Sequence, residues 1–177
     1  MLYLFDLDGT IVVRYSTTLL VGVRSWFDAL DWSQNRVGFV TNQGGVHLHL
    51  HYLKMGGGDF NRYPTMEDVS ERLSAIESEL IPLEHRDKYY RTCCYLYLDR
   101  NGQSLPIPDF GLGKPEWNPY NRKPNPGMLF DQLRWHGVGA EGAIYVGDME
   151  TDRVAAEEAG ILFCEASNFW NNQSQQG

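Results

Sequence analysis

The amino-acid sequence predicts an α/β fold with a doubly wound, mainly parallel five-stranded sheet. Five short apolar runs are nearly continuous instead of alternating with polar residues, which is typical of strands covered on both faces. Helical patterns lie between these runs, so that strands and helices alternate along the chain. The five expected strands are Met1–Phe5, Arg36–Val40, Cys93–Leu98, Ala143–Val146 and Ile161–Cys164.

The best-defined helix is expected over Thr65–Ile81. Thr65 and Asp68 have the spacing of a capping box, in which each side chain bonds to the main chain of the other residue. Apolar residues then recur at helical spacing, at Val69, Leu73, Ile76 and Leu80. Pro82 follows and ends the helix.

Three further helices are expected from the residues at their ends. One has Asn125 as its N-cap, Pro126 at its first helical position and Gly137 at its C-terminal end. The other two are expected over Leu19–Leu30 and Thr151–Ala159, and a glycine follows the second.

The chain length of 177 residues suits one compact domain. We expect this domain to span residues 1–167, with the Asn- and Gln-rich segment 168–177 as a disordered tail. Irregular loops are expected over Met55–Pro64 and Pro106–Asn121, which are rich in glycine or proline.

Composition argues against several classes of protein. A net charge of -8 does not favour broad attraction to nucleic-acid backbones. Three cysteines, an odd number, argue against a disulfide framework. Met1–Phe5 has no basic leader and is too short for a signal peptide or a membrane span. We therefore expect a cytoplasmic protein that has no membrane partner and no obligate protein partner.

Polar residues collect where the expected strands end. In open α/β sheets, ligands bind outside the carboxyl ends of the strands. The segments 6–10 (DLDGT), 41–45 (TNQGG) and 147–152 (GDMETD) follow the first, second and fourth strands. The segment 122–124 (RKP) lies between the third and fourth strands. We expect these four segments to meet at one edge of the sheet.

Carboxylates that converge at this edge predict a metal ion. Two like charges about 4 Å apart repel by roughly 4 kcal/mol at an effective dielectric near 20. Asp6, Asp8 and Asp148 therefore need a cation, and a site made of oxygen ligands suits Mg²⁺. Asp152, one turn after Asp148, either lies near this metal or orients its own helix.

The same residues suit attack by a carboxylate on a phosphate ester. Lys123 and the metal would neutralise the phosphate, while the Thr41 hydroxyl and main-chain N–H groups hold its oxygens. Asp6 can then act as a nucleophile. Asp8, two residues on and facing the same side of an extended chain, can protonate the leaving oxygen and later activate water.

With these motifs in order, the sequence resembles the haloacid dehalogenase (HAD) superfamily of phosphatases. The resemblance runs from Leu2 to about Cys164 and implies the HAD-like, Rossmannoid fold. It implies that the protein is a magnesium-dependent phosphomonoester hydrolase, which forms an aspartyl-phosphate on the nucleophile Asp6, with Asp8 as general acid/base. It also implies that Mg²⁺ is held by the Asp6 carboxylate, the Asp8 main-chain carbonyl and Asp148.

The resemblance further implies which residues hold the substrate. Thr41 and Lys123 are expected to bind the phosphoryl group, and Thr10 and Asn42 to contribute to substrate binding. Arg122 meets either substrate phosphate or only solvent. The substrate itself is either a small phosphorylated compound or a 3′-phosphorylated nucleic-acid end.

The segments around Thr41 and Lys123 resemble those of the small, capless HAD members. This group includes histidinol-phosphate and heptose-bisphosphate phosphatases and the phosphatase domain of polynucleotide kinase-phosphatases. The gap 11–40 leaves no room for a cap domain, so we expect an open site covered only by loops. The cysteines of the bacterial zinc loop are missing from Trp117–Asn121, which counts against either sugar-phosphate assignment.

Two sets of residues leave a structural and a functional interpretation open. Trp117 and Tyr120 either pack locally or stack on a base or sugar of the substrate. The histidines at 47, 49 and 51 either bind zinc, contact substrate, or belong to a polar helix beside the site.

Rival functions share part of this chemistry. A receiver-type signalling module also accepts phosphate on an aspartate, and a phosphotransferase uses the same intermediate with an alcohol as acceptor. A phosphate-binding scaffold without catalysis fits less well, because all four motifs are intact.

Overall fold

The computed structural model describes residues 1–56 and 58–173. Its centre is a sheet of five parallel strands in the order β3-β2-β1-β4-β5. The strands are β1 (Leu2–Phe5), β2 (Arg36–Asn42), β3 (Tyr89–Cys94), β4 (Ala143–Gly147) and β5 (Leu162–Glu165). The predicted doubly wound α/β fold with a parallel five-stranded sheet is confirmed.

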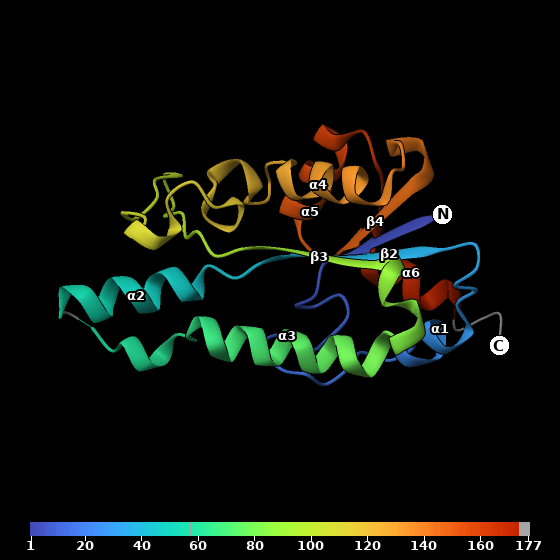
Figure 1. The fold of residues 1–177 in the computed structure, drawn as a ribbon, viewed down its shortest axis with the longest axis horizontal. Coiled ribbons are helices and arrows are strands. Elements are labelled where there is room, and N and C mark those ends of the chain that lie inside the picture. Colours follow the sequence, from blue (N-terminus) through green and yellow to red (C-terminus); the bar gives the residue numbers. More distant parts are fainter. Residues whose placement is uncertain (57, 174–177) are drawn as a thin grey trace.

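Helices cover both faces of this sheet (Figure 1). α1 (Val23–Ala29), α3 (Met66–Leu80) and α6 (Ala166–Gln173) lie on one face, and α4 (Gly127–His136) and α5 (Glu150–Ala159) lie on the other. α2 (Gly45–Met55) instead projects beyond the carboxyl ends of the strands. Over the described part of the chain, no helix has both the length and the apolar character needed to cross a bilayer.

The continuous apolar runs are explained by burial on both faces. In β1, Leu2 and Leu4 join the core under α4 and α5, whereas Phe5 joins the core under α1, α3 and α6. Successive side chains of a strand point to opposite faces, so a strand covered on both sides must be apolar at every position.

The order of the strands places the site. The chain winds outward from β1 to β3 and then returns to β4, which pairs with β1 on its free side. The winding direction therefore reverses between β1 and β4, and ligands bind at such switch points in open α/β sheets. Asp6 and Asp148 lie just beyond these two strands.

Several helix ends follow the predicted signals. Thr65 and Asp68 form the expected capping box at the start of α3. Gly137 and Gly160 end α4 and α5 in the left-handed conformation, with φ of 64° and 71°. The prediction of Asn125 as an N-cap is wrong, because the Asn125 amide donates instead to Pro119 O at 3.0 Å and helix α4 begins two residues later.

The predicted third strand, Cys93–Leu98, is displaced toward the C-terminus. The observed strand β3 ends at Cys94, which pairs with Asn42, the last residue of β2. Beyond it the chain bonds to loops, since Tyr95 N donates to Glu116 O at 2.8 Å and Tyr97 N donates to His47 Nδ1 at 3.1 Å. The apolar run after Cys94 is thus buried by loop packing and not by strand pairing.

The predicted disordered tail over 168–177 is wrong for residues 168–173. These residues belong to α6, where Phe169 and Trp170 are buried and pack against Phe5. The Trp170 indole also donates to Thr10 O at 2.8 Å. Two aromatic side chains therefore outweigh the polar composition of the segment. Residues 174–177 lie outside the described residues.

Candidate active site

Asp6 lies where β1 ends, at the centre of the sheet. Its main-chain N–H donates to Val146 O of β4 at 2.9 Å, so the strand geometry continues to this residue. Only 6% of Asp6 is exposed. The chain then turns back, because the N–H groups of three successive residues, Thr10, Ile11 and Val12, all point at Leu7 O.

Lys123 is the centre of a buried network around Asp6. Its ammonium donates to Asp6 Oδ1 at 2.7 Å and to Asp152 Oδ1 at 2.6 Å. It also lies 2.9 Å from the Tyr145 hydroxyl and 3.1 Å from Val40 O. Tyr145 in turn donates to Asp152 Oδ1. One buried cation therefore connects β1, β2, β4 and the start of α5.

Asn42 fixes the main chain that carries Lys123. The Asn42 amide donates to Lys123 O at 3.1 Å and accepts from Lys123 N at 3.2 Å. Both polar atoms of the side chain thus face the lysine main chain. The geometry makes Asn42 a positioning residue for Lys123, and Asn42 also lines a cavity beside Asp8, so its predicted contact with substrate stays a prediction.

Burial and charge act in opposite directions on this network. Burial disfavours the charged form of Lys123, but the carboxylates of Asp6 and Asp152 outweigh it and raise the pKa of the ammonium. Burial also raises the pKa of Asp6 to about 6, against the opposing effect of Lys123 and with a further increase from Asp152.

Three carboxylates meet at this point. Asp6, Asp148 and Asp152 each offer an oxygen, and these atoms lie within 4.8 Å of one another. Asp148 Oδ1 is buried without a hydrogen-bond partner among the described residues. A set of carboxylate oxygens, one of them buried without a hydrogen-bond partner, fits a hard divalent cation such as Mg²⁺. The structure thus brings Asp6 and Asp148 together, as predicted, and places Asp152 beside them, which is one of the two positions expected for that residue.

Arg14 and Gly9 determine where Asp148 lies. Arg14 forms an ion pair with Asp148 Oδ2. A Cβ atom at Gly9 would lie 2.3 Å from the same oxygen, and Gly9 has a φ of 93°, which favours glycine. The glycine of the DLDGT segment is therefore needed both for the turn and for the space that the carboxylate occupies.

Asp8 points away from Lys123, toward α3. Arg72 Nη1 and Nη2 donate to its two oxygens at 2.8 Å each, and Gln43 Nε2 donates at 3.0 Å. The N–H of Tyr15 donates to Asp8 Oδ1 at 2.8 Å, from a residue with the uncommon φ of 62°. Although burial raises the pKa of Asp8, these hydrogen bonds outweigh it and lower the pKa.

Thr41 and Asp8 share a hydrogen-bond donor, the side chain of Gln43. Gln43 Nε2 donates to Thr41 Oγ1 at 2.9 Å as well as to Asp8. Thr41 is almost fully buried at the end of β2. The predicted catalytic residues Asp6, Asp8, Thr41 and Lys123 thus occupy one edge of the sheet, and Gln43 connects two of them.

Thr10 and Arg122, the other two predicted substrate-binding residues, differ in their access to a cavity. Thr10 is fully buried, its carbonyl accepts from Trp170, and its hydroxyl has no partner among the described residues, so it supports the turn and not a ligand. Arg122 donates to Leu96 O at 2.7 Å and lines a cavity beside Asp8.

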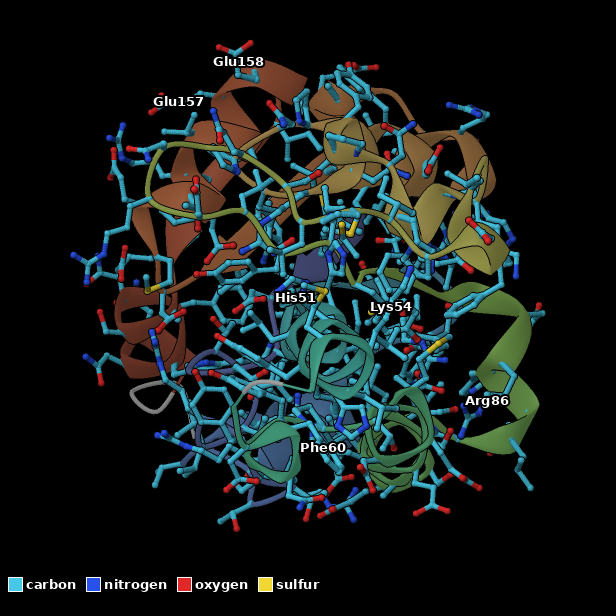
Figure 2. The ribbon with its side chains drawn as sticks, turned by 90° about the vertical axis from the view of Figure 1, so that its left-hand side faces the viewer. His51, Lys54, Phe60, Arg86, Glu157 and Glu158 are labelled. Atoms are coloured by element: carbon cyan, nitrogen blue, oxygen red, sulfur yellow. The ribbon has the colours of Figure 1, made fainter. Side chains whose placement is uncertain are left out.

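The histidines of α2 serve as structural contacts in this chain. His47 is buried, accepts from Tyr97 N at Nδ1 and donates from Nε2 to Pro106 O at 3.0 Å. His49 Nδ1 lies 2.9 Å from Tyr63 O. Figure 2 looks onto this end of the molecule and shows α2 end-on, with His51 labelled on it. The metal-ligand cluster found among the described residues contains no histidine, which counts against the zinc interpretation.

Trp117 is not available to a substrate. It is 1% exposed and packs against His47, Tyr95 and Phe110. Tyr120, by contrast, is about half exposed. The stacking interpretation is therefore wrong for Trp117, which holds the loop after β3 against α2.

Four residues of the site were missed by the sequence interpretation, namely Arg14, Gln43, Arg72 and Tyr145. Gln43 lies inside the TNQGG segment, and Tyr145 places a hydroxyl in an otherwise apolar strand, so both carried a weak signal. Arg72 carried none, because it lies on α3, 64 residues from Asp8 in the sequence.

Comparison with known proteins supports the fold. The structure is similar to the crystal structure of a D,D-heptose 1,7-bisphosphate phosphatase from B. bronchiseptica complexed with magnesium and phosphate. The TM-score is 0.63 at 18% identity, over 99% of each chain. It is also similar to a protein from Mesorhizobium loti described as a HAD-like phosphatase, with a TM-score of 0.52 and 22% identity over 90% of this chain and 68% of that one.

Comparison of sequences alone finds no relative. No family model matches the chain, and no curated protein matches it. At identities below 25%, the structural neighbours establish that this chain has the HAD-like fold. The chemistry has to be argued from the residues of the site.

Proposed function

We propose that this protein is a magnesium-dependent phosphomonoester hydrolase that forms an aspartyl-phosphate on Asp6. The observation that carries the proposal is the contact of Lys123 with both Asp6 and Asp152, beside Asp148, at the switch point of the sheet. A buried lysine and a nucleophilic carboxylate are the groups that phosphoryl transfer needs at such an edge.

The metal would be held by the carboxylates of Asp6 and Asp148 and by the main-chain carbonyl of Asp8. When bound, it would neutralise charge on the phosphate and on the carboxylate cluster. Asp152 accepts hydrogen bonds from Lys123, Tyr145 and Met149 N. It therefore orients the Lys123 ammonium.

The proposed reaction has two halves. An Asp6 carboxylate oxygen attacks phosphorus while the bond to the leaving oxygen breaks, and Asp8, in its protonated form, gives that oxygen its proton. Asp8 then takes a proton from water, which attacks phosphorus and releases inorganic phosphate and free Asp6. Lys123 and the Thr41 hydroxyl would hold the phosphoryl oxygens through both halves.

Turnover of p-nitrophenyl phosphate with Mg²⁺ tests the proposal. We expect wild-type protein to release p-nitrophenol with many turnovers, and Asp6→Asn to be inactive with an unchanged fold. Asp28→Asn, an exposed carboxylate on α1, is the matched control and should keep full activity. Normal activity in Asp6→Asn would refute the nucleophile assignment.

The same experiment separates the rival functions. A receiver-type module would take up one phosphoryl group per chain without sustained release. A phosphotransferase would turn over much faster when an alcohol is added as acceptor, with the phosphorylated alcohol as product. We propose that water is the acceptor, since no contact among the described residues favours either rival.

We also propose a small phosphorylated compound as substrate, and not a 3′-phosphorylated nucleic-acid end. A cavity of about 700 Å³ adjoins Asp8, which is a suitable size for a small molecule. The net charge of -8 gives no general attraction to a polyanion.

A further inference from the structure

The two carboxylate oxygens of Asp148 have different surroundings. Oδ1 is buried and has no hydrogen-bond partner among the described residues. Oδ2 accepts from Arg14 Nη2 at 2.5 Å. Asp6 and Asp152 each bring an oxygen within 4.8 Å of one oxygen of Asp148, at the proposed metal site. Asp148 therefore has one oxygen that lacks a partner and one that an ion pair already occupies.

Gly9 packs against the occupied oxygen. A Cβ atom at Gly9 would lie 2.3 Å from Asp148 Oδ2 and 3.1 Å from Arg14 Nε. The main chain of the turn after β1 is thus close to both members of the ion pair. A metal ion could reach Oδ2 only after the Arg14 guanidinium had moved away, whereas no hydrogen bond has to break at Oδ1.

Contacts of the main chain and of the side chain hold Arg14 in this position. The N–H of the next residue, Tyr15, donates to Asp8 Oδ1 at 2.8 Å and anchors the loop. Arg14 Nη2 also lies 2.9 Å from Met149 Sδ, beside Asp148. The Arg14 side chain is 48% exposed, so a substitution there does not disturb the core.

The charge of Arg14 cannot by itself favour one divalent cation over another. The hydrogen bond to Asp148 and the charge of that carboxylate raise the pKa of the guanidinium, so Arg14 stays charged. A fixed positive charge repels Mg²⁺ and Ca²⁺ to the same extent, because both ions carry two charges. Any preference that Arg14 causes must come from the oxygens that it leaves available.

Mg²⁺ and Ca²⁺ differ in the way that they use a carboxylate. Mg²⁺ binds oxygens at about 2.0–2.1 Å and demands near-octahedral geometry. The two oxygens of one carboxylate lie too close together to fill two neighbouring corners of that octahedron. Ca²⁺ takes roughly six to eight oxygens at about 2.3–2.6 Å and accepts both oxygens of one carboxylate. A carboxylate with only one available oxygen therefore suits the smaller ion.

We propose that Arg14 determines the metal specificity of the site, because it restricts Asp148 to coordination through Oδ1 and so makes the site prefer Mg²⁺ to Ca²⁺. This inference rests on the proposed magnesium site. Arg14 acts through Asp148 and is thus a positioning residue. An ion pair with a purely structural role at this half-exposed position would stabilise the fold only slightly and would treat the two ions alike.

Titration of the thermal unfolding midpoint with MgCl₂ or CaCl₂, at constant ionic strength and without substrate, tests this inference. Each series gives a dissociation constant, because an ion that binds the folded chain raises the midpoint with its concentration. We expect the ratio of the Ca²⁺ constant to the Mg²⁺ constant to exceed one in wild-type protein. Arg14→Gln should lower this ratio by about tenfold, an effect typical of residues that bond to metal ligands. Arg14→Lys, which keeps a donor near Oδ2, should lower it less.

Arg24→Gln is the matched control and should keep the wild-type ratio. The side chains of Arg24 and Arg14 are 50% and 48% exposed, and Arg24 also forms an ion pair with a carboxylate, that of Asp28 on α1. The ratio is taken within one variant, so neither a change of stability nor the loss of a positive charge affects it. If Arg14→Gln does not fold, Arg14→Met takes its place with the same expectation.

The possible outcomes separate this inference from the proposed function. Equal ratios in wild type and Arg14→Gln, or a wild-type ratio of one or less, would overturn the inference and leave the magnesium site standing. No response of either protein to either ion would overturn both. If both proteins bind Mg²⁺ but do not turn over p-nitrophenyl phosphate, the phosphatase proposal fails and the ratio still decides the inference. With turnover, Ca²⁺ should inhibit the Mg²⁺-dependent reaction more strongly in Arg14→Gln than in wild type.

Discussion

Arg72, on helix α3, donates to both carboxylate oxygens of Asp8, at 2.8 Å each. This bidentate contact fixes the orientation of the Asp8 carboxylate, the proposed general acid/base. A lysine in its place would keep the charge but lose the paired geometry.

The first prediction concerns this contact. Arg72→Gln should lower kcat for p-nitrophenyl phosphate by about 10–100-fold, since a misdirected general acid/base loses most of its effect. Arg72→Lys should recover part of the loss. A purely structural role would instead lower thermal stability in step with activity and would show no recovery by lysine. Arg24→Gln is the control and should behave as wild type.

The second prediction uses the contact between Gly9 and Asp148. Gly9→Ala should lower activity by about 100-fold, because the added Cβ atom must displace the Asp148 carboxylate. Gly137→Ala is the matched control, since its φ of 64° is also positive but its Cβ atom would meet nothing within 4 Å. Both variants should lose about 1–2 kcal/mol of stability from the backbone strain. Equal activity in the two would contradict the proposed placement of Asp148.

The third prediction concerns the carboxylate cluster and is independent of activity. Mg²⁺ should raise the midpoint of thermal unfolding of wild-type protein, since a ligand at 100 times its dissociation constant stabilises by about 2.7 kcal/mol. Asp148→Asn should respond much less, and Asp28→Asn should respond as wild type. Excess EDTA should reverse the shift and stop phosphatase turnover. An equal Mg²⁺ response in Asp148→Asn would exclude the cluster as the metal site.

The fourth prediction follows from His136 on α4. Burial, followed by the charge of Arg36, lowers the pKa of His136 to about 4 from the ordinary value of 6.5. Between these values the unfolded chain binds more protons than the folded one, so stability is complete above pH 6.5 and decreases as the pH falls. The free energy of unfolding should therefore fall less between pH 7 and pH 5 in His136→Asn than in the wild type. The difference should be on the order of 1 kcal/mol, measured by urea unfolding. An unchanged pH dependence would contradict the assignment.

The sequence was informative where structure depends on neighbours in the chain. The Thr65 and Asp68 capping box, the glycine ends of α4 and α5 and the apolar runs of β1 and β4 all depend on local spacing, and they were predicted correctly. The third strand was misplaced because Tyr95–Leu98 is as apolar as a strand but is buried by loops.

The site residues that belong to sequence motifs could be predicted, and the other site residues could not. Asp6, Asp8 and Asp148 follow the ends of β1 and β4, so their approach could be inferred from the topology of an α/β sheet. Lys123 lies in the loop between β3 and α4, and its place was implied only by the RKP motif. Arg72 and Arg14 approach from a helix face and a loop, where no periodic pattern marks them. Thr10 belongs to the DLDGT segment, yet the fold turns its side chain inward, which only the three-dimensional structure could show.

Lys123 reaches Asp6 across 117 residues of chain, and β1 is flanked on one side by β4. During synthesis, β1 therefore keeps an open edge until residue 143 and beyond have emerged from the ribosome. Asp6 has no ammonium beside it until Lys123 has been added. A nascent chain would therefore assemble the proposed site only after β4 and Asp148 have been synthesised, and a shorter polypeptide would lack the contacts that the proposed reaction uses.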